Sequence, residues 1–412
     1  MLYLILFLGL IGVFEWYAFK GLYAAVLEKP QWMKSSVKVG MIAIFLLQWG
    51  GLVYLMMNFA EFRNTRPNLV MVISGFFFVV LFPKFFIAAF HMIDDARWLV
   101  SKFVGMVKTS GNAGGPVVSR NTFLTTIGQI SGGVMLGSVL YGVTKGKYNY
   151  KVKKHLISDP SIPVEFNSTR IVQFSDAHLG SFLENFEDVQ KGIDIINSLE
   201  ADYVLFTGDL VNNVSSEAEP WIDVFKGIKA KKGKFSVLGN HDYADYGQLP
   251  EEEKLQSRKR LAEIQEEMGF RLLLDENVQL KKGDSIIDLI GVENWGSSFK
   301  QKGDIDKALK GVDNDRFQIL MSHDPSHWDK IIKGNYSINL TLSGHTHGMQ
   351  FGVEIPALDI KWSPVKFRYK YWDGLYQEGK QFLHVNRGFG FLGFPGRVGM
   401  WPEITVLELQ NA

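Results

Sequence analysis

The sequence predicts an α/β domain preceded by an N-terminal bundle of about four membrane-spanning helices. Long apolar runs dominate the first third of the 412 residues, whereas strand-like and helix-like patterns alternate through the remainder. Short motifs rich in aspartate and histidine stand just after the strand-like runs. Because ligands of α/β domains collect at the carboxyl ends of the strands, the motifs and the alternating pattern support the same fold class.

Composition narrows the chemistry that this chain can perform. A formal net charge of +1 argues against a broad nucleic-acid surface, which usually requires a strongly basic face. The chain contains no cysteine, so it has no disulfides and no thiolate ligands. Any bound metal must therefore be held by oxygen and nitrogen atoms.

Four apolar runs approach the roughly 20 residues needed to cross a bilayer. A buried helix of a soluble protein is rarely apolar on every side, and four in succession favour a membrane region. Glu15 and Lys84 interrupt two of these runs, and they would either pair inside the bundle or extend to the interface. The predicted spans lie near 2–19, 40–57, 69–91 and 123–143.

The spans set the predicted domain boundaries. We expect a transmembrane region over 1–144, a basic juxtamembrane linker with the first strand over 145–168, and the α/β domain over 169–412. Lysine and arginine are almost evenly divided between the two sides of the membrane, so charge does not fix the orientation. The segment Ser119–Leu124 resembles a twin-arginine export signal whose second arginine is replaced, although it also suits a basic helix cap. We expect a multi-pass protein of the bacterial cytoplasmic membrane with an extracytoplasmic domain, and the cytoplasmic face is the alternative.

Five motifs carry side chains that bind metals. Residues two apart in an extended segment project to the same side, so each Asp-x-His or His-x-His pair can reach one cleft. Glycine precedes several of these residues, where tight turns and close backbone approach are needed. The motifs are Asp176-Ala-His178, Gly208-Asp209, Gly239-Asn240-His241-Asp242, His323-Asp324 and Gly344-His345-Thr-His347. Together they predict a metal centre at one edge of a sheet.

In order and in residue type, these motifs resemble the calcineurin-like metallophosphoesterase family, whose pattern runs Asp-x-His, Gly-Asp, Gly-Asn-His-Asp/Glu, His, Gly-His-x-His. The resemblance extends from about Tyr148 to the C-terminus. Within the family the chain is similar to a membrane-anchored bacterial branch, related to twin-arginine-exported phosphodiesterases and more distantly to UDP-diacylglucosamine hydrolases. This resemblance implies a four-layer sandwich of two β-sheets flanked by helices, with two bound divalent metals.

The resemblance also implies a ligand for each position. The first metal would be bound by Asp176, His178 and His347, the second by Asn240, His323 and His345, and Asp209 would bridge the two. A bridging carboxylate offsets part of the charge of two dications held about 3.5–4 Å apart. Imidazole with carboxylate suits manganese, iron, zinc or cobalt, and the sequence does not choose among these metals.

The implied reaction is hydrolysis of a phosphodiester, a phosphomonoester or a pyrophosphate by a hydroxide that bridges the metals. His241 would act as general acid and protonate the leaving group. Many family members orient this histidine with an aspartate three positions after Gly-Asp, where this chain has Asn212, and Asp242 is a possible replacement. Asparagine can accept a hydrogen bond from the ring but offers no charge to stabilise an imidazolium.

The C-terminal region has two further candidates for function. Arg387 and Arg397 lie in a glycine-rich segment and could clamp phosphate oxygens, with ordinary salt bridges as the alternative. An aromatic stretch that includes Trp362 and Phe367 could contact the bilayer, although its alternation is also typical of a half-buried strand.

Two function classes remain open from the sequence. The first is a membrane-anchored phosphoesterase whose partners are the lipid bilayer and a phosphate-containing small molecule or lipid. The second is a membrane assembly or scaffold protein that keeps the metal-binding fold with little catalysis. Seven matching metal ligands favour the first class, because a fold kept only for its shape does not need them.

Overall fold

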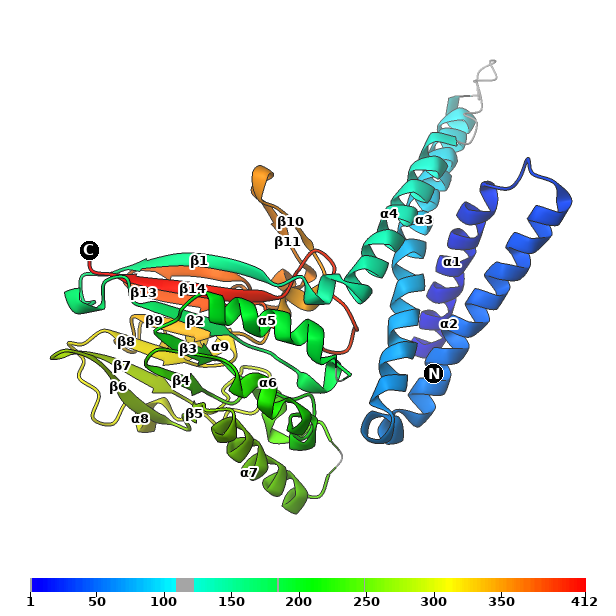
Figure 1. Ribbon diagram of the computed structural model, residues 1–412. Helices are drawn as coiled ribbons and strands as arrows, with labels where there is room; N and C mark the ends of the chain where they lie inside the picture. Colours follow the sequence, from blue (N-terminus) through cyan, green and yellow to red (C-terminus); the bar gives the residue numbers. More distant parts are fainter. Residues whose placement is uncertain (1, 109–121, 184, 248) are drawn as a thin grey trace. The chain divides into compact units, whose positions relative to one another are not determined.

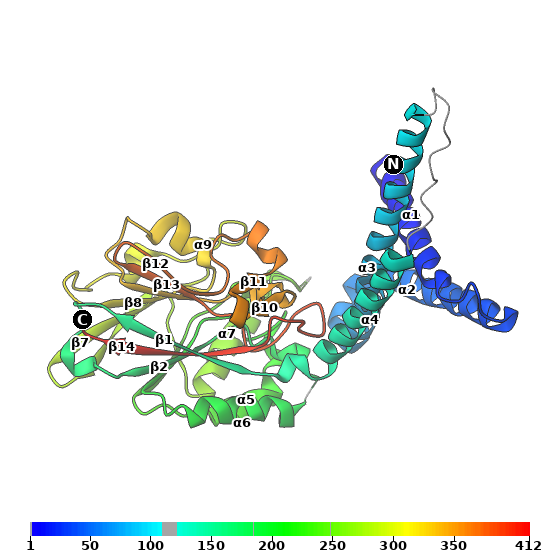
Figure 2. The same cartoon turned by 90° about the horizontal axis from the view of Figure 1, so that it is seen from above.

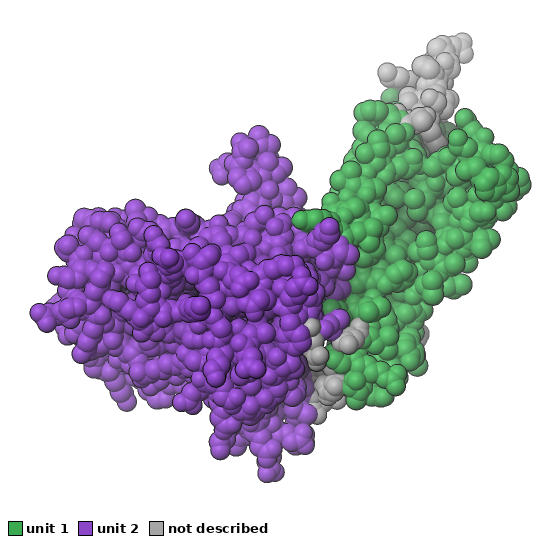
Figure 3. Space-filling view, in the orientation of Figure 1, with its two compact units in different colours: residues 1–141 green, residues 142–412 purple. Residues whose placement is uncertain are grey.

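The computed structural model describes residues 2–108, 122–183, 185–247 and 249–412. It contains two compact units, residues 1–141 and residues 142–412, which are coloured separately in Figure 3. Three residues of the export-like segment Ser119–Leu124 lie outside the described residues, so the structure does not bear on that interpretation.

The first unit is helical. Within the described residues, three helical segments are long and apolar enough to cross a membrane, namely Gln31–Phe59, Leu69–Val104 and Phe123–Thr144. A further helix covers the first apolar run of the sequence, 2–19. The helices are α1 (Leu2–Ala24), α2 (Gln31–Thr65), α3 (Pro67–Lys108) and α4 (Thr122–Thr144).

A polar cluster connects three helices of this unit. Lys84 Nζ of α3 lies 2.8 Å from Glu15 Oε2 of α1 and donates to Gln48 Oε1 of α2 at 2.7 Å. The indole nitrogen of Trp49 donates to Glu15 Oε1 at 2.8 Å. Charged side chains among apolar helices are costly unless they are paired. Glu15 and Lys84, which interrupt two apolar runs of the sequence, form such a pair.

The second unit is built on two six-stranded sheets of mixed direction (Figure 1). The first sheet has the order β1-β14-β2-β3-β4-β5, and the second has the order β12-β13-β9-β8-β7-β6. The strands of the first sheet are β1 (Lys151–Ser158), β2 (Arg170–Phe174), β3 (Tyr203–Phe206), β4 (Gly233–Ser236), β5 (Arg271–Leu272) and β14 (Glu403–Gln410). Those of the second are β6 (Glu276–Lys282), β7 (Ser285–Gly291), β8 (Gln318–Met321), β9 (Leu340–Ser343), β12 (Gly374–Glu378) and β13 (Gln381–Val385).

The main core lies between the sheets, and helices cover their outer faces. Ile171 and Leu205 of the first sheet join Ile319 of the second in one buried cluster. On the outer face of the first sheet, the Phe174 ring lies 6.3 Å from the Phe225 ring of α6. Strands buried on both faces are typical of parallel pairs covered by helices. The helices are α5 (Phe186–Ser198), α6 (Ile222–Lys226), α7 (Glu251–Glu267), α8 (Ile305–Ala308) and α9 (Pro325–His327).

This arrangement confirms the predicted four-layer α/β sandwich. Figure 2 shows α5 and α6 on one side of the paired sheets and α9 on the other. The outer cluster of the second sheet contains Leu320 of β8, Ile305 of α8 and the buried Trp328. The predicted first strand corresponds to β1, which pairs in parallel with β14 at the edge of the first sheet.

A third, two-stranded sheet projects from the domain (Figure 1). It consists of β10 (Val353–Ile355) and β11 (Ile360–Trp362), which pair antiparallel. We call this element the β10–β11 hairpin.

Candidate metal centre

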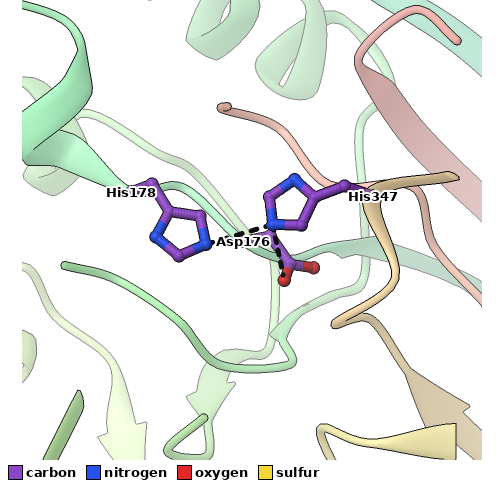
Figure 4. A group of neighbouring side chains, drawn as sticks. All are labelled: Asp176, His178 and His347. Atoms are coloured by element: carbon purple, nitrogen blue, oxygen red, sulfur yellow. Dashed lines mark hydrogen bonds and ion pairs between the residues drawn. The ribbon is translucent and has the colours of Figure 1, made fainter. Parts of the chain in front are cut away.

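The first group of possible ligands contains Asp176, His178 and His347, all buried (Figure 4). One ligand atom from each residue lies within 4.8 Å of the others. The two imidazole Nε2 atoms are 3.1 Å apart, and His347 Nε2 lies 3.3 Å from Asp176 Oδ1. The loops after β2 and β9 supply these side chains, so residues far apart in sequence converge at one place.

The second group contains Asp209, His323 and His345. His323 Nε2 lies 3.0 Å from Asp209 Oδ2 and 3.2 Å from His345 Nδ1. These residues follow β3, β8 and β9, whose carboxyl ends carry the motifs as the sequence predicts.

Asp209 faces both groups. Its Oδ2 atom lies 3.0 Å from His323 Nε2 of the second group and 3.6 Å from His178 Nε2 of the first. One carboxylate between two sets of imidazole nitrogens is the arrangement that a bridging ligand needs.

Asn240 adds an oxygen that protein contacts leave unused. Its side chain is buried, and Oδ1 has no hydrogen-bond partner among the described residues. The amide nitrogen donates to the Tyr246 hydroxyl at 2.8 Å, so the oxygen alone is unsatisfied. An unpaired buried acceptor costs about 1–3 kcal/mol, and a bound cation would remove that cost.

The carboxylates and imidazoles are electrostatically prepared for cations. Burial lowers the pKa of His178 and of His345, which keeps these rings neutral and their lone pairs available. Burial also lowers the pKa of His323, but the neighbouring Asp209 and Asp176 outweigh it and raise this pKa to about 10. The buried carboxylates of Asp176 and Asp209 thus favour positive charge between the two ligand groups.

Hydrogen bonds to the backbone select the nitrogen that each histidine presents. His178 Nδ1 donates to the Val211 carbonyl at 3.2 Å, and His323 Nδ1 donates to the Thr207 carbonyl at 2.8 Å. A carbonyl only accepts, so Nδ1 carries a proton in both rings and Nε2 is the atom that faces a metal. In His323 a metal would displace the Nε2 proton that the raised pKa retains. His345 is reversed, because its Nε2 lies 2.8 Å from the Tyr369 hydroxyl and its Nδ1 faces His323.

Asp242 holds two ligand loops together. Its carboxylate oxygens accept hydrogen bonds from the backbone nitrogens of Asp209 at 2.8 Å, Leu210 at 2.8 Å and Gly239 at 2.9 Å. Gly208 has φ +94°, and a Cβ there would overlap the Gly239 backbone, so the loops after β3 and β4 approach closely. Asp242, the possible replacement for the family's aspartate, therefore does not orient the His241 ring, since both of its oxygens accept from backbone nitrogens.

The backbone orients His241. Its Nδ1 lies 2.7 Å from the Asn212 carbonyl oxygen, and its ring stacks on Tyr246 with centroids 4.3 Å apart. The Asn212 side chain instead donates to Ser181 Oγ at 3.0 Å. Replacement of the family's aspartate by asparagine therefore leaves the ring positioned, because the main chain supplies the acceptor.

Carboxylates surround Arg387. Its guanidinium donates to Asp373 at 2.6 and 2.7 Å and to Glu354 at 2.7 and 2.9 Å. These contacts are the salt bridges that the sequence offered as the alternative to a phosphate clamp.

Arg397 is enclosed by backbone carbonyls and lies against a ligand. It donates to the carbonyls of Gly390 at 2.7 Å and Arg387 at 2.8 Å, and its Nη2 lies 3.2 Å from His347 Nδ1. It therefore supports the first ligand group from behind.

The glycine-rich segment that contains both arginines braces the Asp176 turn. Phe389 N donates to the Ser175 carbonyl at 2.7 Å, and Gly390 N donates to the Asp176 carbonyl at 2.9 Å. A Cβ on Gly390 would overlap the Ala177 carbonyl oxygen. Sequence reasoning missed this support, although the density of glycine was a signal for close backbone approach.

Two other contacts to the ligands were also missed from sequence. Ser175 Oγ donates to Asp176 Oδ2, and the Tyr369 hydroxyl contacts His345. Tyr369 lines an opening of about 220 Å³ that also carries Arg368, Lys330 and Lys370. The aromatic stretch could have pointed to Tyr369, whereas nothing in the sequence marks Ser175.

Comparison with known proteins agrees with this geometry. Residues 169–349 match the family model described as "Calcineurin-like phosphoesterase". Residues 1–147 match "Probable Calcineurin-like phosphoesterase, transmembrane domain".

Three curated relatives are similar over more than half of this chain. An uncharacterized metallophosphoesterase of Helicobacter pylori (strain J99) is 30% identical over 278 residues, 67% of this chain and 68% of the relative. The uncharacterized metallophosphoesterase YkuE of Bacillus subtilis is 29% identical over 300 residues, 71% and 98%. The UDP-2,3-diacylglucosamine pyrophosphatase LpxG of Chlamydia muridarum is 26% identical over 281 residues, 56% and 82%.

Proposed function

The chain belongs to the calcineurin-like metallophosphoesterases, a family of hydrolases of phosphate esters, and we propose that it is a dinuclear phosphoesterase that acts at a membrane. Its N-terminal region is a transmembrane domain. The observation that carries the proposal is the position of Asp209 Oδ2, within 3.6 Å of imidazole nitrogens from both ligand groups. The unpaired Asn240 oxygen supports it.

The residues fit two divalent metals. Asp176, His178 and His347 would hold one, Asn240, His323 and His345 the other, and Asp209 would bridge them. Manganese, iron, zinc or cobalt suits this imidazole and carboxylate set. When bound, such metals supply Lewis acidity that activates water and offsets the charge of the phosphoryl group.

The chain's own residues supply orientation and a proton. His241 Nδ1 donates to the Asn212 carbonyl, so Nε2 is the atom that takes up a second proton, and the imidazolium so formed can pass that proton from Nε2 to the leaving oxygen. Arg387 and Arg397 hold the surrounding loops, and their contacts favour this supporting role over a direct contact with phosphate.

We propose a membrane-borne or membrane-adjacent substrate that carries a phosphodiester, phosphomonoester or pyrophosphate group. The transmembrane domain supports this proposal, as does the similarity to a pyrophosphatase whose name gives a diacylated substrate. Arg368, Lys330 and Lys370 line the opening beside Tyr369 together with Asp329, and this excess of positive charge suits an anionic ligand. Comparing the lipids of cells with and without the protein would identify the compound that accumulates.

We also propose that the protein lies in a bacterial cytoplasmic membrane with its catalytic domain outside the cytoplasm. The native chain has no cysteine, so a single Val164→Cys variant gives an unambiguous label. A membrane-impermeant maleimide should label this exposed position in intact cells. Labelling only after lysis would place the domain in the cytoplasm.

The test of hydrolysis uses the purified full-length chain with manganese and a chromogenic bis-phosphodiester. The wild type should bind two metals and release product, whereas Asp209→Ala should lose the bridge and at least about 100-fold in activity, comparable with loss of a catalytic group. His155→Gln, a change at a half-buried histidine on β1, is the matched control and should keep both properties. A wild type that binds two metals yet hydrolyses no phosphate ester would favour the scaffold alternative.

A further inference from the structure

The β10–β11 hairpin has one apolar face and one charged face. Val353 pairs with Trp362 and Ile355 pairs with Ile360, so these four side chains share one face of the ribbon. Glu354 pairs with Lys361 on the opposite face. In an ordinary surface ribbon the apolar face would pack on the domain and the charged face would meet water.

Here the charged face is the one that is anchored. Glu354 accepts from Arg387 Nη1 at 2.7 Å and from Lys153 Nζ at 2.7 Å. Lys361 Nζ donates to the Asp373 carbonyl oxygen at 2.8 Å. Since Arg387 and Asp373 are buried, these bonds fix the ribbon to the interior of the domain and orient its apolar face outward.

The outward face of the hairpin is exposed to solvent and consists of apolar side chains. Val353, Ile355, Ile360 and Trp362 are 37% to 46% exposed, and Leu358 in the turn is 65% exposed. A cluster of large apolar side chains held in solvent by salt bridges to the buried residues Arg387 and Asp373 marks an interaction surface.

We infer that the β10–β11 hairpin docks on the lipid bilayer that the helices of this chain cross. The chain's own transmembrane domain keeps the second unit beside a bilayer, which makes lipid the partner available to every copy. Tryptophan and aliphatic side chains next to lysine suit the interface between headgroups and acyl chains. The turn also carries Asp359, whose charge opposes deep insertion, so the ribbon lies along the surface with its apolar face immersed.

Docking would place the catalytic site close to its substrate. His347, a proposed metal ligand, stands six residues before Val353, and Arg397, which contacts His347, lies in the same segment as the hairpin anchor Arg387. Docking of the hairpin on lipid is separate from hydrolysis, because the hairpin can contact lipid whether or not the site turns over substrate.

The test uses the full-length chain in lipid nanodiscs with one environment-sensitive fluorophore. Leu358→Cys is labelled, and nitroxide-bearing lipids serve as quenchers. Val164→Cys, an apolar position of 63% exposure on a different part of the domain, is the matched control. We expect the label at 358 to lose at least half of its fluorescence to the lipid quencher and the label at 164 to lose little.

A second variant separates the effect of the hairpin from that of the dye. Adding Ile355→Ser and Ile360→Ser to Leu358→Cys should restore most of the fluorescence, because the pair of isoleucines next to the turn becomes polar, which halves the apolar face, while the Glu354 anchor remains. Equal quenching at 358 and 164, or quenching that survives the serine changes, would overturn the inference. So would a label shielded from aqueous iodide but untouched by lipid quenchers, which would show a protein partner or a second copy instead. Circular dichroism of each variant establishes that it folds.

Discussion

Five of the proposed metal ligands hold backbone angles in the left-handed region, which non-glycine residues rarely adopt. They are Asp176, His178, Asp209, His345 and His347, with φ between 46° and 71°. Each such position costs on the order of 1 kcal/mol, and a cluster of them persists only where surrounding contacts hold it. Bonds from Asp242, Ser175 and the glycine-rich segment provide those contacts.

At this scale, His241 can be tested as a proton donor. His241→Ala should reduce hydrolysis of an alkyl phosphodiester by about 100-fold to 10,000-fold, because the alkoxide leaves without a proton. A nitrophenyl ester should be affected far less, since nitrophenolate needs no protonation. Steady-state rates with both esters check this, and Asn212→Ala should change neither, because the ring contacts the backbone carbonyl. Equal losses with both esters would remove the general-acid role.

Asn240 can be tested by metal analysis. Asn240→Ala removes a buried oxygen, so we expect the affinity for one of the two metals to fall at least about tenfold. Asn240→Asp should retain two metals, because it keeps an oxygen donor. Metal content after dialysis against a weak chelator distinguishes these outcomes, with His155→Gln as control. Two tightly bound metals in Asn240→Ala would exclude Asn240 from the ligands.

At the scale of the elements, ion pairs attach the β10–β11 hairpin to the rest of the domain. Its polar face is attached through Glu354 to Arg387 and Lys153, and through Lys361 to Asp373. Burial alone would raise the pKa of Glu354, but the hydrogen bonds and charges of Arg387 and Lys153 outweigh burial and lower this pKa to about 2. The ionised carboxylate therefore stabilises the attachment.

The attachment should depend on pH in the acid range. Because the folded pKa of Glu354 lies below its ordinary value of 4.5, the stabilisation is complete above about pH 4.5 and is lost as the pH falls toward 2. A spin label at Leu358→Cys should become more mobile across that window. Glu354→Gln should show the mobile spectrum at pH 7, at a cost of about 1.5–3 kcal/mol in attachment. Glu252→Gln, at an exposed position of α7, should behave like the wild type.

For the whole molecule, the division into two units separates anchoring from chemistry. The proposed ligands all lie in the second unit, whereas the first unit has its own polar cluster of Glu15, Gln48 and Lys84. Each unit therefore has a separate source of stability. The proposed metals would bind the folded second unit far more tightly than its unfolded chain, so they should stabilise that unit alone.

Removal of the metals should reveal this separation. A strong chelator should destabilise the second unit by roughly 2.7 kcal/mol if the metals had been present at 100 times their dissociation constant. Hydrogen exchange measured by mass spectrometry should quicken in peptides from 142–412 and remain unchanged in peptides from the first unit. Asp209→Ala, which lacks the bridging carboxylate and should hold the metals less tightly, should respond less to the chelator. Faster exchange in both units would show that they are coupled.

The sequence alone determined the fold class, the family resemblance and the candidate ligands. Apolar run length limits what can cross a membrane, and strand-end motifs are local in the chain, so both are legible without coordinates. The tertiary structure decided what the sequence left open. Arg387 bonds Glu354 and Asp373, Asp242 holds backbone nitrogens, and the Asn212 carbonyl orients His241. Those partners depend on which loops come together in the folded chain. The type of a residue alone does not determine whether its charged or polar group contacts a carboxylate, a carbonyl or a substrate.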